Sequence, residues 1–198
     1  MTDWIKLHGE HRALRATGGS SLQEIRRVLQ LLIKLEHASP SLTGRFTNKR
    51  NKDTSRREWH ITAPKDAKAE EKAEWSEPLL NLAPGIAEAR LTILAITEES
   101  DVKLSKLTVM LSGQSAAGAP FIVAAHLDDC HMGLGACGHA LFHCHVGPSF
   151  SAPPEVRVPL PALRPAATLE WALSVVLLNW EPVPWSEVVA HFAPKKKV

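Results

Sequence analysis

The chain has 198 residues, 44% of them hydrophobic and 22% charged, and its formal net charge of +2 is ordinary for a soluble globular protein. No apolar run is long enough to span a bilayer and no secretory-signal pattern opens the sequence, so we expect a cytoplasmic protein without membrane contact. Three cysteines in a reducing compartment are better interpreted as thiols or metal ligands than as a disulfide scaffold.

The first predicted element is an amphipathic helix over residues 22–37. Its apolar residues recur at intervals of three and four, namely Leu22, Ile25, Val28, Leu29, Leu32 and Leu35. Ser21 and Glu24 have the spacing of a capping box, and the glycines at 18 and 19 are typical of a turn before it. Pro40 predicts that the helix has ended by that point.

Residues 42–63 are rich in basic side chains and are expected to form a hairpin or loop, with Phe46 and Trp59 on either side of a polar middle. Basic side chains can bind phosphates while an aromatic ring stacks on a base, so segment 45–59 is a candidate contact for nucleic acid or a protein partner. The candidate contact residues are Arg45, Lys49, Arg50, Lys52, Arg56, Arg57 and Trp59. The alternative is a solvated hairpin tip. Residues 64–78 are alanine-rich with mixed charge and predict a short surface helix or linker, which would complete an insertion before the sheet.

From residue 89 onward the hydrophobic pattern has a period of two, which is typical of β-strands. Strands are predicted at residues 89–97, 102–111, 121–128, 138–146 and 156–160, and helices at 168–179 and 185–192. A helix, then consecutive strands, then helices indicates a single α+β domain over residues 1–198. Its largely antiparallel sheet of about five strands, from residues 89–160, would be packed by an N-terminal helix and two C-terminal helices.

The densest chemical signal lies between His126 and His145. This stretch of 20 residues holds all three cysteines and five of the ten histidines, together with Asp128 and Asp129. Thiolates, imidazoles and carboxylates are the groups that bind borderline-soft divalent metals. Such a concentration is hard to explain by packing alone, and it predicts a functional site.

Strand alternation predicts the geometry of this site. In the strand at 138–146, three histidines share one face while Cys144 shares the apolar face and is expected to be buried. If this strand pairs with residues 121–128 as a hairpin, His126 lies opposite Leu141 and diagonally within reach of His143. The predicted metal ligands are His126, Asp128, His139, His143 and His145, and zinc is the expected metal.

A divalent metal with an open position can activate water, so the same hairpin is a candidate hydrolase site for an unknown small substrate. Asp128 and Asp129, at the end of the first strand, are the candidate catalytic carboxylates, and Asp129 suits a general base.

A second arrangement uses the loop between the two strands. Cys130 and Cys137, with His131 or His139, could close a tetrahedral structural zinc site. Six residues separate the two cysteines, which is wider than the spacing of two to four usual in zinc ribbons and favours the first arrangement. A nucleophilic Cys130 or Cys137 paired with a histidine is a further alternative.

The segment FIVAAHLDDCHMGLG, residues 121–135, resembles the opening motif of the zinc-dependent de-N-acetylases that act on N-acetylglucosaminyl substrates. In that family an apolar strand ends in His-Pro-Asp-Asp, is followed by glycines and belongs to a Rossmann-like fold. The resemblance implies that His126 and Asp129 ligate zinc and that Asp128 is the general base. Leu127 stands where the family has proline, and the motif falls late in this chain.

Two functions from different classes therefore remain open. The first is a small intracellular metal-binding protein, with a metal-dependent hydrolase as its enzymatic form. The second is a non-enzymatic subunit that binds nucleic acid or protein through residues 45–59, with the histidines incidental.

Overall fold

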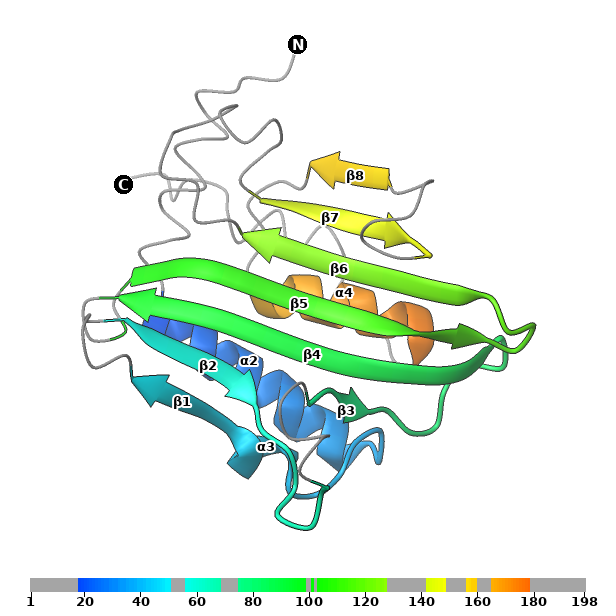
Figure 1. Ribbon diagram of the computed structural model, residues 1–198, viewed down its shortest axis with the longest axis horizontal. Coiled ribbons are helices and arrows are strands. Elements are labelled where there is room, and N and C mark those ends of the chain that lie inside the picture. The colour runs from blue at the N-terminus through cyan, green and yellow to red at the C-terminus, as the bar shows by residue number, and fades with distance from the viewer. Residues whose placement is uncertain are drawn as a thin grey trace, which may run out of the picture.

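The computed structural model describes residues 18–50, 56–68, 75–98, 101, 103–127, 142–148, 156–159 and 165–178 (Figure 1). These residues form one antiparallel sheet with helices on one face, so the predicted α+β class is confirmed. The sheet has eight strands, more than the sequence predicts, because both strands of the basic hairpin and the short segment Glu77–Pro78 also join it.

The strands lie almost in chain order across the sheet (Figure 1). The path runs through β1 (Phe46–Arg50), β2 (Arg57–Ile61), β4 (Ile86–Glu98), β5 (Lys103–Ser115), β6 (Pro120–Leu127), β7 (Phe142–Gly147) and β8 (Val156–Pro159). The short β3 (Glu77–Pro78) pairs with β4 beside this path. Strand β2 pairs with both β1 and β4, so the hairpin is part of the sheet and not an insertion outside it.

The two faces of the sheet differ because side chains alternate along each strand. In β4 the residues Leu91, Ile93 and Ala95 are buried, while Thr92 and Leu94 between them are half-buried on the other face. Strand β5 repeats this pattern with Leu107, Val109 and Leu111 buried. The core therefore lies on one side of the sheet.

Two helices cover that buried side, α2 (Gly18–Lys34) and α4 (Pro165–Val176), which Figure 1 shows together behind the strands. Their buried apolar residues are Leu22, Ile25, Val28, Leu29 and Leu32 in α2 and Leu169, Ala172, Leu173 and Val176 in α4. Burying each leucine or isoleucine contributes about 1.5–3 kcal/mol. No helix in the described part of the chain lies over the opposite face, which we call the open face.

Helix α2 differs from its prediction at both ends. It begins at Gly18, within the segment predicted as a turn, so the buried Ser21 lies inside the helix and is not its N-cap. It ends through Glu36, whose φ of 60° is left-handed, with the His37 amide donating to the Leu32 carbonyl. This is a Schellman ending, which a sequence search for glycine misses when another residue takes the left-handed position.

Other predictions are met in part. The five strands expected from residue 89 onward are all present, with ends displaced by a few residues, and the helix predicted at 168–179 is α4. Within 64–78, a turn is closed by the hydrogen bond from the Ala67 amide to the Pro64 carbonyl, and Glu77–Pro78 form β3, with no helix among the described residues. The helix predicted at 185–192 lies outside the described residues.

A buried ion pair links the short α3 (Leu42–Arg45) to β3. Arg45, at the end of α3, pairs with Glu77 of β3, and both side chains are buried. Glu77 also accepts hydrogen bonds from the Ser39 amide and the Trp75 indole, each at 3.3 Å. Burial of two charges is tolerated when further hydrogen bonds satisfy them.

Candidate functional site

The predicted pairing of the two histidine-bearing strands is confirmed. Strands β6 and β7 pair antiparallel, and His126 is the register partner of His143. The prediction placed Leu141 opposite His126, so the register differs by two residues. A shift of two keeps every residue on its face, because the side-chain period is also two. In the observed register, position 143 lies directly opposite His126, whereas the predicted register places it diagonally.

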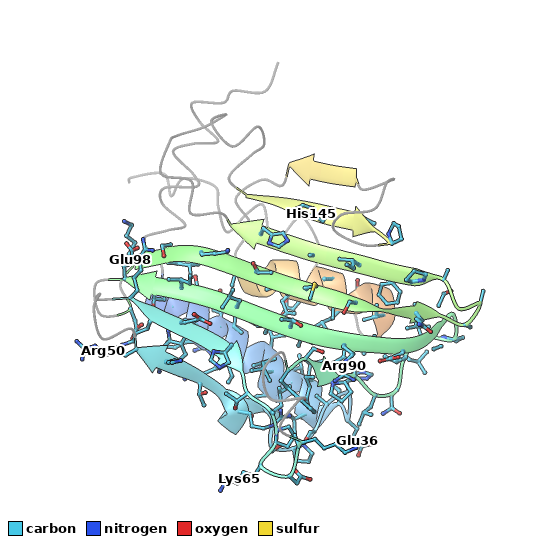
Figure 2. The ribbon with its side chains drawn as sticks, in the orientation of Figure 1. Glu36, Arg50, Lys65, Arg90, Glu98 and His145 are labelled. Carbon is cyan, nitrogen blue, oxygen red and sulfur yellow. The ribbon has the colours of Figure 1, made fainter. Side chains whose placement is uncertain are left out.

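His145 lies beside His126 on the open face of the sheet. The two ring centroids are 4.7 Å apart with the rings nearly perpendicular, at 82°. His145 is the register partner of Ala124, whose small side chain leaves room for the imidazole to lean along the sheet toward His126. His145 is 8% exposed, and Figure 2 shows it on β7, at the side of the sheet away from the basic hairpin.

A third strand contributes a positioning group. Thr108 of β5 is the register partner of His126, and a hydrogen bond of 3.1 Å links Thr108 Oγ1 to His126 Nδ1. In the tautomer in which Nδ1 carries the proton, the hydroxyl accepts it and Nε2 holds the lone pair. A hydrogen bond to one imidazole nitrogen is the usual way in which proteins orient a metal-binding histidine through the other.

Several predicted site residues lie outside the described part of the chain, namely Asp128, Asp129, Cys130, His131, Cys137 and His139. The remaining predicted ligands are His126, His143 and His145, and for His143 only the backbone position is described. Among the described residues no group of three or more histidine, cysteine, aspartate or glutamate side chains is placed to hold a metal. Cys144 is buried, as predicted.

Some basic side chains of segment 45–59 form ion pairs within the fold, which leaves fewer of them available for a partner than composition suggests. Arg56 pairs with Glu98 at 2.8 Å, and Arg57 pairs with Asp101 at 2.7 Å. Lys49 and Arg50 are exposed on β1, at the edge of the sheet, while Lys52 lies outside the described residues.

Two of the residues predicted to contact nucleic acid are in the interior, which corrects their assignment to a surface. Trp59 is 6% exposed, and its indole N–H donates to Thr97 Oγ1 at 3.1 Å. Arg45 is 8% exposed and engages Glu77 and the Thr62 carbonyl. The alternation of Trp59 with Ile61 on one strand was a signal for burial that the basic composition concealed.

Sequence reasoning also missed two polar residues of the open face. Thr108 contacts His126, and His60 of β2 lines a pocket described below. The available signal was the same for both: each occupies a polar position between buried apolar residues of its strand.

Comparison with protein-family models, with curated proteins and with solved structures finds no match to this chain. The likeness of residues 121–135 to the de-N-acetylases therefore has no support beyond its motif. The described sheet is antiparallel throughout, unlike the Rossmann-like fold of that family, and the segment that follows the glycines pairs as β7. None of the helices in the described ranges is long and apolar enough to cross a membrane.

Proposed function

We propose that this chain binds a divalent metal, most suitably zinc, on the open face of strands β6 and β7. The ligands are His126, His143 and His145, with Asp128 or His139 as candidates for a further position. The observation that carries the proposal is the 4.7 Å approach of the His126 and His145 rings on strands whose register sets position 143 opposite His126.

Three considerations support this reading over incidental histidines. Two imidazoles whose rings are this close can, when neutral, both donate a ring nitrogen to one cation. Imidazole nitrogen is a preferred zinc ligand, and three neutral histidines leave a position for water or substrate. The hydroxyl of Thr108 lies where an outer group that orients a ligating histidine is expected.

The enzymatic form of the proposal is a metal-dependent hydrolase acting on a small substrate. A zinc ion held at this site would supply Lewis acidity and a low-pKa water. Asp128 and Asp129 follow directly after β6 in the sequence and are the proposed general-base candidates.

Zinc affinity tests the binding proposal directly. The full chain, prepared without a histidine tag and stripped of metal, is titrated with zinc in competition with a chromogenic chelator. We expect one equivalent to bind, and His126→Ala and His145→Ala each to weaken that binding by at least about tenfold. The control is His60→Ala, which removes a histidine of the same face that lies outside the cluster. Equal affinities in all four proteins would overturn the proposal.

The competing structural-zinc arrangement gives a different pattern in the same titration. If Cys130 and Cys137 hold the ion, Cys130→Ser and Cys137→Ser abolish binding while His126→Ala has no effect. That outcome rejects the histidine site on β6 and β7.

A further inference from the structure

A pocket of about 680 Å³ lies on the open face, and neither His126 nor His145 lines it. Its walls come from β2, β4, β5 and the segments that adjoin β2 and β3. The lining residues used below are Glu58, His60, Ala63, Trp75, Leu94 and Met110. The volume falls in the range typical of small-molecule sites, which is about 300–1,000 Å³.

The pocket has a structural cause in the pairing of β4. Along one edge, β4 pairs with β2 through residues 94–97 and with β3 through residues 90–91. Thr92 and Ile93 lie between these two registers and have no partner in either, and both residues line the pocket. The hollow is therefore the gap where one strand partner ends and the next begins.

The polar side chains of the pocket lining are Glu58, His60 and four hydroxyls, those of Thr62, Ser76, Thr92 and Ser112. Its lining includes one carboxylate, Glu58, and no lysine or arginine. The guanidinium of Arg90 is nearby but is committed to the Ser76 hydroxyl and carbonyl, each at 2.8 Å, and lies over the Trp75 ring. The nearest cation by strand register is Lys49 of β1, the partner of Glu58, which does not line the pocket. An anion in the pocket would therefore meet a carboxylate and no cation of the lining, whereas a neutral hydrogen-bond donor would not be repelled.

His60 adds an unused hydrogen-bonding group. Its Nδ1 is buried and has no hydrogen-bond partner among the described residues. A buried polar atom left unpaired is destabilising. Because His60 lines the pocket, a donor on a ligand bound there could satisfy this nitrogen. The apolar side chains of Leu94, Met110 and Ala63 suit the body of such a ligand.

We propose that this pocket binds a small, uncharged aromatic molecule that carries an N–H donor, with His60 as the acceptor. The site is separate from the proposed metal site, because none of its lining residues belongs to the histidine cluster. Its occupancy does not depend on the metal, so the two proposals can fail independently.

The test uses two fluorescent probes with the same aromatic amine skeleton. N-phenyl-1-naphthylamine is neutral, and 8-anilinonaphthalene-1-sulfonate adds one negative charge. The metal-free full chain is titrated with each probe, with the probe excited directly. We expect the neutral probe to saturate at one site and the sulfonate to bind more weakly. Glu58→Gln should strengthen sulfonate binding roughly two- to fivefold. The variant removes the repulsion between the Glu58 carboxylate and the sulfonate, which is weakened by solvent.

A matched pair of variants assigns the binding to the pocket. Leu94→Trp fills the space, and Ile96→Trp places the same side chain two residues along the same face of β4, outside the lining. We expect Leu94→Trp to weaken the neutral probe by about tenfold or more and Ile96→Trp to leave it unchanged. His60→Phe keeps an aromatic ring without nitrogen and should weaken binding roughly fivefold.

Circular dichroism and thermal unfolding establish that each variant is folded before it is titrated. Equal affinity of Leu94→Trp and Ile96→Trp for the neutral probe would overturn the proposal, as would the absence of saturable binding. Tighter binding of the sulfonate than of the neutral probe would overturn the assigned ligand class.

Discussion

Thr108 is the residue whose contact gives the histidine cluster its orientation. Its hydroxyl hydrogen-bonds to His126 Nδ1 across paired strands, and no other role for that hydroxyl is evident in the described part of the chain. Thr108→Val keeps the size and branching of the side chain. We predict that zinc affinity falls about 10–100-fold, in the range measured for outer groups of metal sites. Chelator competition measures it, and unchanged affinity would remove Thr108 from the site.

The pair of Arg45 and Glu77 makes a second prediction, on stability. Arg45→Met leaves the Glu77 carboxylate buried without its cation, which should cost about 3–5 kcal/mol in the free energy of unfolding. The matched control is Arg57→Met. Arg57 and its partner Asp101 are both partly exposed, so losing this pair should cost about 0.2–1 kcal/mol. Urea unfolding distinguishes the two, and similar losses would contradict the account of the buried pair.

Glu98 carries the pH prediction. Burial raises the pKa of its carboxyl, but Lys103 and Arg56 together outweigh that effect and hold the pKa below the usual 4.5. A depressed pKa in the folded state stabilises the protein above the unfolded pKa, and this contribution is lost as pH falls through the folded value. Thermal unfolding of Glu98→Gln should therefore show a smaller drop in stability below about pH 4.5 than the wild type shows. If the stability of the two proteins falls equally below about pH 4.5, the assignment of this effect to Glu98 is rejected.

At the scale of elements, the sequence predicts where the long strands lie better than it predicts which strands pair and in which register. The period-two pattern of β4 and β5 is strong because alternate residues face a helix-covered core. Alternation also predicts the face on which His126 and His143 lie but leaves the register open in steps of two, which is why Leu141 was placed opposite His126. The β2–β4 pairing was missed because the choice of a distant partner leaves no local pattern.

Helix α2 shows the same limit at its ends. The apolar spacing predicts its middle, but Gly18 and Gly19 are helical despite their poor propensity, and Ser21 is buried rather than capping. Packing against the sheet decides these positions, and propensity is too weak to oppose it. For the candidate site, composition directs attention to the strands that became β6 and β7, while the contact of Thr108 with His126 depends on strand pairing that only the fold supplies.

Gly113 makes the prediction for the β4–β5 pairing. It is the partner of Ala89 close to the irregular register at residues 86–88, and a Cβ there would lie 1.9 Å from the Glu88 carbonyl oxygen. Because backbone must move to admit a methyl group, Gly113→Ala should lower the free energy of unfolding by about 1–3 kcal/mol. Gly44→Ala in α3, with nothing within 4 Å, should leave it unchanged or raised. Urea unfolding compares the two, and equal effects would show that the strands separate without cost.

At the scale of the whole molecule, the sheet has a packed face and an open face. Helices α2 and α4 cover the first, while the histidine cluster and the pocket lie on the second. The basic hairpin forms one edge of the same sheet, and its cations Arg56 and Arg57 are already paired within the fold. Of the two functions open from the sequence, metal binding is the one that we propose.

Metal content tests that claim most directly. The full chain is purified without a histidine tag, supplied with zinc, manganese and iron, and analysed by plasma mass spectrometry beside His126→Ala/His143→Ala. We predict about one equivalent of a divalent metal in the wild type, as expected for one ligand set, and its loss in the double variant. An equal metal content in the two proteins, or no metal in the wild type, would contradict the account.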